Sequence, residues 1–505
     1  MPPSGRRSAL RGQGLPMALR AVLIAGAVFA VPALADVLDI TRPTTDFSRP
    51  ERYENNPGGA TTYRGTVTHN AFSQPSANLG FGDRATFNIG NSIFRRVWVS
   101  APSSTQASDG LGPLYNARAC QRCHLKDGRG HPPEGNYPDD TAVSMLMRLS
   151  IPPESEADHA LLDSGRAATL PDPVYGGQLQ DLAIQGHAIE GRIHTAWEEM
   201  PVALADGEIV SLRRPTYSIT DFGYGAPHPG LMMSVRVAQP MIGLGLLELI
   251  SEDDILANAD PDDSDGDGIS GRPNRVWSVA DDRLMLGRFG WKANQPTLMQ
   301  QIAAAFSGDV GLSSPLFPDA WGECTDAQAA CRGAIHGDSP QYEGLEIPSD
   351  LMDALLFYNR NLAVPARRES DDPQVLAGKQ LFYETGCIGC HVPKYVTLTD
   401  ETMPAQSHQL IWPYTDLLLH DMGDGLADNR PDGLATGSEW RTPPLWGIGL
   451  TEVVSGHTYF LHDGRARSLT EAILWHGGEA QAMRDAFAAM GREEREAMLA
   501  FLRSL

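Results

Sequence analysis

Apolar residues in the last third of the chain recur at helical spacing and predict three helices. The first starts at Asp372-Pro373, carries one apolar face and stops at Gly386. The second begins with the capping box Ser468-Leu-Thr-Glu471 and ends at Gly477-Gly478. The third is amphipathic and runs from Glu493 to Leu505. We therefore expect this part of the chain to be a compact helical domain.

The longer N-terminal part has a weaker pattern. Apolar residues cluster from Phe87 to Trp98, which predicts a helix with one apolar face. A charged, Pro-containing stretch over 363–372 has the composition of a linker. The predicted organisation is a loop-rich N-terminal domain over 36–362 and a C-terminal domain over 373–505.

The first 35 residues match a secretory signal peptide. A basic start precedes the apolar run from Ala21 to Val31, and Ala33-Leu34-Ala35 has the pattern of a cleavage site. That run is too short to span a bilayer comfortably, and no later run is longer. We expect residues 1–35 to be removed, and an exported protein without a membrane span, most simply in a bacterial periplasm.

The chain is acidic, with 63 Asp and Glu against 40 Lys and Arg and a formal net charge of −23. Such a surface repels nucleic acid and anionic lipid, so no nucleic-acid partner is expected. It suits a basic or dipolar redox partner.

Four of the six cysteines belong to two copies of a Cys-x-x-Cys-His motif. The copies are Cys120, Cys123 and His124, and Cys387, Cys390 and His391. Two thiols at this spacing can hold a haem by thioether bonds while the following His ligates the iron. A zinc half-site or a redox dithiol would also use Cys-x-x-Cys, but zinc needs a second ligand pair and neither copy has one nearby. Two covalent c-type haems are therefore predicted.

The other two cysteines, Cys324 and Cys331, lie in a turn-rich stretch. In an exported protein this spacing favours a disulfide that closes a surface loop.

An acidic segment resembles a calcium-binding loop. Asp263, Asp265, Asp267 and Gly268 match positions 1, 3, 5 and 6 of an EF-hand loop, whereas Asn274 stands at position 12 in place of Glu. A calcium site and a solvated acidic turn both fit this pattern.

Two further histidines could reach iron. His476 falls on the apolar face of the helix that starts at Ser468, where its imidazole needs either haem iron or a backbone carbonyl as partner. His131, in the loop after the first motif, could reach the far side of the first haem or lie in solvent.

The two halves of the sequence echo each other. Ser211-Leu-Arg-Arg-Pro-Thr-Tyr resembles Glu439-Trp-Arg-Thr-Pro-Pro-Leu, and Pro296-Thr-Leu-Met-Gln-Gln-Ile matches Arg467-Ser-Leu-Thr-Glu-Ala-Ile. Two copies of one haem-binding unit would explain this echo. The predicted fold class is mainly α, with two cytochrome c-like haem domains, the N-terminal one enlarged by loop-rich insertions.

These motifs, with the ending Tyr459-Phe-Leu-His-Asp-Gly-Arg465, resemble the bacterial di-haem cytochrome c peroxidases and their relative that matures methylamine dehydrogenase. The runs Asp109–Asn116, Gly266–Asn274 and Glu439–Leu450 are similar to the di-haem oxidoreductases sometimes labelled thiol oxidoreductases. The thiol label has no support in the sequence, because all six cysteines have other uses. The resemblance implies a haem-dependent oxidoreductase, most simply a peroxidase.

The resemblance also implies site residues. The peroxidase motif places a Trp ten residues before a Gln, followed by an acidic residue and Met-Gly; here these are Trp291, Gln301 and Asp309-Val310-Gly311. Trp291 would lie between the haems, and Gln301 with Asp309 would line the peroxide pocket. The acidic end departs from the pattern in spacing and in Val310, so Glu190, ten residues after Gln180, is a rival for the catalytic acid.

At the second haem, the family position of the distal ligand matches His476, and Met422 is an alternative. Thr442-Pro443-Pro444 matches a family calcium element. The implied electron path runs from a small cytochrome c or cupredoxin through the second haem and past Trp291 to peroxide at the first. A relay cytochrome, an enzyme oxidising a partner protein, and a structural role are the alternatives.

Overall fold

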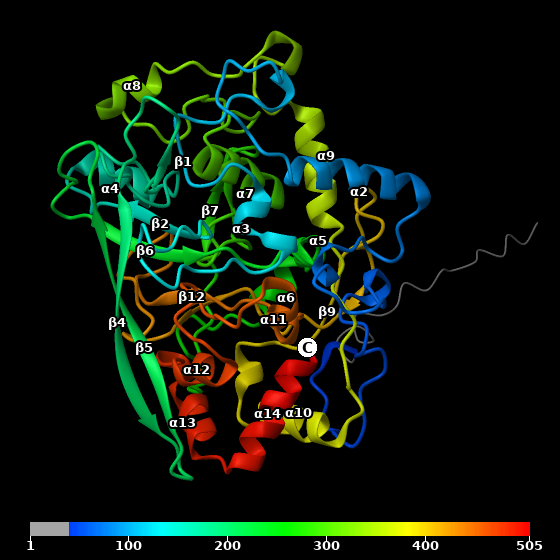
Figure 1. Ribbon diagram of the computed structural model, residues 1–505. Helices are drawn as coiled ribbons and strands as arrows, with labels where there is room; N and C mark the ends of the chain where they lie inside the picture. Colours follow the sequence, from blue (N-terminus) through cyan, green and yellow to red (C-terminus); the bar gives the residue numbers. More distant parts are fainter. Residues whose placement is uncertain (1–39) are drawn as a thin grey trace, which may run out of the picture. The chain divides into compact units, whose positions relative to one another are not determined.

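Helices and small antiparallel sheets alternate along residues 40–505, the part of the chain that the computed structural model describes (Figure 1). Thr41–Leu505 form one compact unit. The predicted signal peptide over 1–35 lies outside the described residues. Within them, no helix combines the length and apolar character needed to cross a bilayer.

The α-helices of the described part are α2 (Phe81–Phe94), α3 (Cys120–Cys123), α4 (Glu156–Asp163), α5 (Leu244–Glu248), α6 (Glu252–Leu256), α7 (Leu298–Ala305), α8 (Ala329–Arg332), α9 (Ser349–Arg360), α10 (Pro373–Glu384), α11 (Thr451–Ser455), α12 (Leu469–Leu474), α13 (Gln481–Ala489) and α14 (Arg492–Ser504). The strands are β1 (Leu114–Tyr115), β2 (Met145–Ser150), β3 (Leu182–Ala183), β4 (Arg192–Ala203), β5 (Ile209–Thr220), β6 (Met232–Val237), β7 (Arg275–Ser278), β8 (Arg283–Leu286), β9 (Tyr395–Val396), β10 (Leu410–Ile411), β11 (Leu419–Asp421) and β12 (Glu439–Arg441).

The prediction of a mainly α protein is wrong. The structure is 30% helical and 17% strand, with several two-stranded sheets. It does not show the predicted cytochrome c-like domains. Much of the strand content comes from the insertions of the first half, which form the long hairpin β4–β5 and the β2–β6 pair instead of loops. Alternating side chains on either side of the turn at Asp206-Gly207 favour this hairpin over helix or loop.

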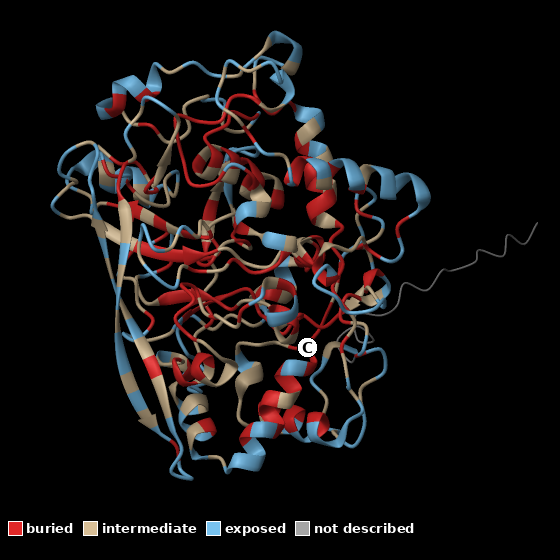
Figure 2. Ribbon diagram, viewed as in Figure 1, coloured by how far each residue is buried: buried red, intermediate tan, exposed pale blue. Residues whose placement is uncertain are grey.

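The β4–β5 hairpin binds to the second half of the chain. In Figure 1 it is a long ribbon that extends from the region of β2 and β6 to that of α13, and Figure 2 shows that little of it is buried. Arg213 donates to the carbonyls of Gly464 and Arg465 at 3.0 Å each, and Tyr217 donates to Asp463 at 2.9 Å. Beside the turn, Arg495 pairs with Asp206 at 2.7 Å. The hairpin therefore links the first half of the chain to the second half.

Two helix pairs cross closely enough to require glycine. A Cβ on Gly90 of α2 would lie 2.2 Å from the carbonyl oxygen of Ala354 on α9. A Cβ on Gly378 of α10 would lie 1.8 Å from the carbonyl oxygen of Ala497 on α14. Any side chain at either glycine would push the helices apart. Each half thus contains one closely packed helix pair.

The apolar core consists of two large clusters that follow these pairs. One includes Phe87, Ile302 and Leu355 from α2, α7 and α9. The other combines residues of α10, α12, α13 and α14 with residues outside these helices, and includes Leu212 and Trp291 from the first half. Segments from each half of the chain contribute to the apolar cluster of the other half. The domain boundary predicted at 363–372 therefore stays a prediction.

Local signals in the last third are confirmed. Asp372 caps α10 by accepting from the amides of Gln374 and Val375, and α14 forms at the C-terminus. Ser468 caps α12, but Glu471 accepts from the amide of Arg467 and not from that of Ser468, so the capping box is incomplete. The predicted disulfide between Cys324 and Cys331 is present.

The helix predicted over Phe87–Trp98 is shifted. It begins at Phe81 and ends at Phe94, and Val97 is 53% exposed.

Candidate functional site

Both Cys-x-x-Cys-His motifs line a single cavity of about 430 Å³. The first motif forms the one-turn helix α3, and the second forms a 3₁₀ turn that follows Gly386, which has a φ of 95°. The cavity is lined at the motifs by Cys120, Cys123, His124, Cys387, Cys390 and His391. The chain therefore brings together two motifs that are 267 positions apart in the sequence.

The two motif histidines have the same environment. His124 Nδ1 lies 2.7 Å from the carbonyl oxygen of Gln239, and His391 Nδ1 lies 2.9 Å from that of Tyr414. A carbonyl fixes Nδ1 as the protonated nitrogen and leaves the Nε2 lone pair for a metal. Burial lowers the pKa of His124, and it lowers the pKa of His391 to about 4, so both rings are neutral at pH 7.

These donor sets fit haem better than zinc. None of the four motif cysteines forms a disulfide. Over residues 40–505, the one group of three or more His, Cys, Asp or Glu ligand atoms close enough to hold a metal ion is the acidic trio of Asp263, Asp265 and Asp267. A structural zinc site would need four converging ligands. Each motif offers two thiols and one imidazole nitrogen to a largely apolar cavity, as a covalently held haem requires.

Asp309 lies at the first motif, and both Asp309 and Gln301 line the cavity. The carboxylate of Asp309 is close enough for its charge to raise the pKa of Cys120 and Cys123, after the larger effect of burial. Gln178 donates to Asp309 Oδ1 at 2.9 Å and fixes the carboxylate. The structure therefore brings Asp309 to the first motif and Gln301 to the cavity that the two motifs share.

Glu190, the rival acid, does not line the cavity. Its side chain is 1% exposed and accepts from the Gln180 amide at 2.6 Å and from Gln328 Nε2 at 2.5 Å. Burial raises its pKa to about 8. Gln180 donates to the carbonyl oxygen of Gly308 at 2.8 Å, beside Asp309. Glu190 thus supports, through Gln180, the part of the cavity wall that carries Asp309.

His476 lies at the second motif. Its Nδ1 is 2.7 Å from the carbonyl oxygen of Ala472, which leaves Nε2 for iron. The two predicted partners of this ring, a backbone carbonyl and haem iron, are therefore compatible. The side chain lines the cavity, and its charge adds to burial in lowering the pKa of His391. Met422 lines the same cavity.

Trp291 also lines the cavity. It is 7% exposed and donates from Nε1 to the carbonyl oxygen of Val237 at 2.8 Å, while the Arg129 guanidinium carbon lies 5.5 Å from the ring centre. His131 is not among the lining residues and packs edge-on against His457 at 4.8 Å.

The helices α7 and α12 realise the predicted echo. Thr297 caps α7 and Ser468 caps α12, each by accepting an amide three residues on. Eight residues after these caps stand Ala305 and His476, and both line the cavity. The two halves therefore differ at equivalent positions by a methyl group in one and an imidazole in the other.

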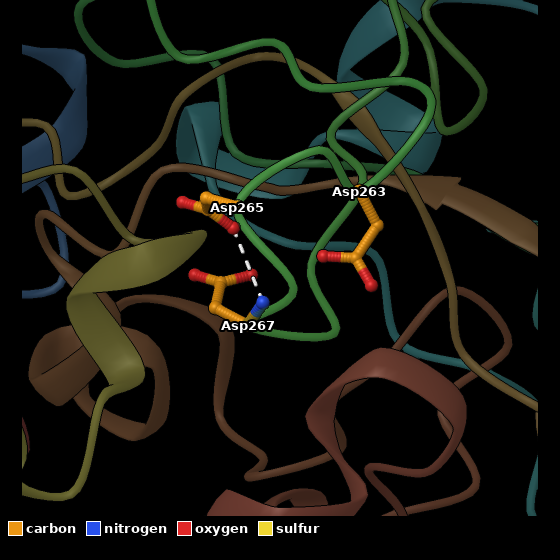
Figure 3. Close-up of side chains that lie close together, drawn as sticks. All are labelled: Asp263, Asp265 and Asp267. Carbon is orange, nitrogen blue, oxygen red and sulfur yellow. Dashed lines mark hydrogen bonds between the residues drawn. The ribbon is translucent and has the colours of Figure 1, made fainter.

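The acidic loop is exposed, and its three Asp residues are not among those that line the cavity. The three carboxylates lie close together (Figure 3) and offer oxygens within 4.8 Å of one another. Asp263 Oδ1 accepts from the Gly268 amide at 3.0 Å, and Asp265 Oδ1 accepts from the Asp267 amide at 3.1 Å. Asn274 is buried and bonded to three backbone groups, so position 12 is used for packing.

The predicted family calcium element is Thr442-Pro443-Pro444. Its Thr442 carbonyl oxygen accepts two hydrogen bonds, from Thr415 Oγ1 at 2.6 Å and from Arg441 at 3.1 Å.

Three residues of the site were not predicted from the sequence. Ala305 and Arg441 line the cavity, and Gln178 holds Asp309. The echo between the halves could have revealed Ala305, because it aligns with His476. Gln178 carries no local signal. Arg441 lies in the repeated run Glu439-Trp-Arg-Thr-Pro-Pro-Leu, but its contacts with Gln239 and Gly290 join segments far apart in the chain.

Comparison with known proteins gives a family. A family model described as "Di-haem oxidoreductase, putative peroxidase" matches residues 52–505. No curated protein sequence matches. Among solved structures, a chain from Kuenenia stuttgartiensis hydrazine synthase pressurised with xenon is similar, at 17% identity and a TM-score of 0.23. The match covers 37% of this chain and 64% of that one. On the family match, which spans nearly the whole sequence, this chain belongs to the di-haem oxidoreductases.

Proposed function

We propose that this protein is an exported di-haem c-type oxidoreductase that reduces peroxide at the haem of the first motif. Cys120 and Cys123 would attach that haem, and Cys387 and Cys390 the second, with His124 and His391 as the proximal ligands. Electrons would come from a small cytochrome c or cupredoxin and pass through the second haem. The localisation proposed is the periplasm.

The observation that carries the proposal is the difference between Ala305 and His476. An imidazole opposite a motif histidine favours a six-coordinate, electron-transferring iron. A methyl group at the equivalent position leaves room for a small substrate at the first motif, next to Asp309.

The reaction consumes two electrons and two protons for each hydrogen peroxide and releases two waters. A haem held by Cys120, Cys123 and His124 would supply the redox-active iron. Asp309 would accept a proton from the near oxygen and return it to the far oxygen, acting as general base and then as general acid. Gln178 holds the carboxylate in place, and Gln301 lines the pocket. Trp291, buried in the cavity wall, would lie on the electron path.

The Asp263, Asp265 and Asp267 loop is proposed as a calcium site of low coordination, completed by water in place of the missing Glu. Its role would be to stabilise a loop that lies against the second motif, since a Cβ on Gly389 would meet Ile269 at 2.6 Å.

The test is a spectroscopic peroxide titration of the haem-loaded, half-reduced protein, followed by reduced small cytochrome c. We expect the first haem to be oxidised and the donor to turn over steadily. Ala305→His should place a ligand at the first haem and abolish both effects. If the unmodified protein keeps two inert, six-coordinate haems, it is an electron relay. Reaction with peroxide without donor turnover would instead favour oxidation of a partner protein.

A further inference from the structure

Arg441 occupies an unusual position between the two motifs. Its side chain is buried, lines the cavity and donates to three acceptors: Gly290 O at 2.8 Å, Thr442 O at 3.1 Å and Gln239 Oε1 at 2.8 Å. In the described part of the chain no carboxylate lies within ion-pair distance of it. Burial lowers its pKa to about 10, so it stays charged at pH 7. It is a buried cation whose hydrogen bonds go to neutral acceptors, while the carboxylate of Asp416 lies near enough to raise its pKa.

On one side, Arg441 is connected to the first motif. Gln239 accepts from Arg441 through its side chain and from His124 Nδ1, at 2.7 Å, through its backbone carbonyl. One residue therefore joins the guanidinium to the first proximal ring.

On the other side, Arg441 is connected to the second motif. The Thr442 carbonyl that accepts from Arg441 also accepts from Thr415 Oγ1 at 2.6 Å. Thr415 follows Tyr414, whose carbonyl oxygen accepts from His391 Nδ1 at 2.9 Å. The two proximal rings thus share one network, with Arg441 at its centre.

We propose that Arg441 is a positioning residue common to both haem sites, which orients both proximal histidines and raises the reduction potentials of both irons. Reduction adds a negative charge, and a buried cation to which no carboxylate is directly bonded favours that state. The same guanidinium donates to Gly290 next to Trp291, so it also fixes the segment between the motifs. The inference rests on the part of the proposed function that assigns a haem to each motif, and not on peroxide reduction.

The experiment is a spectroelectrochemical titration of the haem-loaded Arg441→Gln variant, without peroxide. We expect both haems to become harder to reduce, with the oxidised-to-reduced ratio at fixed potential rising about tenfold, or about 59 mV per haem. The matched control is Arg288→Gln. Arg288 is half-buried at the cavity and donates to the carbonyls of Leu247 and Ile250, but has no bond to either motif. It should shift one haem at most. A shift of neither haem, or of only one, in Arg441→Gln would overturn the proposal.

Two milder variants keep the test decisive if Arg441→Gln does not fold. Gln239→Met cuts the network on the first side and Thr415→Val on the second. Each should change the iron–histidine resonance Raman band of its own haem and leave the other unchanged. If neither band moves, Arg441 does not act through these residues. A haemochrome spectrum showing two haems, measured on every variant, separates this outcome from failure of the haem assignment.

Discussion

The two motif regions share a frame and differ on the opposite side of the cavity. Phe94 lies 6.2 Å from His124, and Phe382 lies 6.1 Å from His391, at ring angles of 48° and 50°. Each Phe belongs to a helix with a glycine at its closest crossing, and each His donates to a carbonyl. Across the cavity, Ala305 and Asp309 stand at the first region, whereas His476 stands at the second.

We interpret the repeated Phe–His frame as the support for a haem at each motif. The residues that differ between the regions would set the reactivity of each haem. The proximal frame can be duplicated because every haem of this kind needs the same support. Under the proposed function, the residue eight positions after each helix cap, Ala305 or His476, would decide whether the iron has a second protein ligand or is left open to a substrate.

The largest expected effect comes from removing the acid found in only one region. Asp309→Ala should lower kcat/KM for peroxide by about 10²–10⁴-fold, because proton transfer by a placed carboxylate contributes about that much. Steady-state turnover with reduced cytochrome c measures it. Asp309→Glu, which keeps the carboxylate, should retain more activity, and an unchanged rate in Asp309→Ala would remove the chemical difference between the regions.

Glu190, the rival acid, should affect stability and not turnover. Its pKa is raised by burial from 4.5 to about 8, so the folded state holds a proton that the unfolded state releases. Stability is therefore present below about pH 4.5 and is lost as pH rises towards about 8, by on the order of 3 kcal/mol at pH 7.

Chemical denaturation of Glu190→Gln between pH 5 and 8 checks this prediction. The variant should lose less stability with rising pH than the unmodified protein and keep its peroxide activity. Parallel pH curves for the two proteins would contradict it.

Changing the ligand of the second region should alter its potential alone. His476→Met replaces an imidazole by a thioether, which raises haem potentials. We expect at least a tenfold change in the oxidised-to-reduced ratio of the second haem, about 59 mV. The matched variant Met422→Leu should leave it unchanged. The opposite result would make Met422 the ligand.

Calcium should have the smallest effect. Free calcium at several times its dissociation constant should stabilise the protein by on the order of 1 kcal/mol. Thermal unfolding with and without chelator measures this, and Asp263→Asn with Asp265→Asn should abolish the difference. A response that survives both substitutions would place the cation elsewhere.

Prediction from sequence succeeded where the signal is local. The two motifs, the Asp372 and Ser468 caps and the cystine loop depend on residues within a few positions of each other. The β4–β5 hairpin was missed even though Asp206-Gly207 between alternating stretches is a strong hairpin signal. Its fit to Gly464 and Arg465 could not be foreseen, because such contacts depend on where a distant segment lies.

The site shows the same division. Asp309, Gln301 and His476 were identified from motif spacing and the structure places all three at the cavity. Glu190 matched a spacing equally well but lies behind the wall, since spacing alone does not define which way a side chain points. Arg441 lies in the run Glu439–Leu450 that carries the family resemblance, but its bonds to Gln239 and Gly290 join distant segments, so its role could not be foreseen.

The cavity wall has a consequence for biogenesis. It is built from residues as distant as Phe94 and Leu502, so it is complete only when α14, the last helix, has packed against α10. Contacts over such long chain separations form late, because closing large loops is entropically costly. Under the proposed function, haem would therefore have to reach the four thiols before this wall is complete.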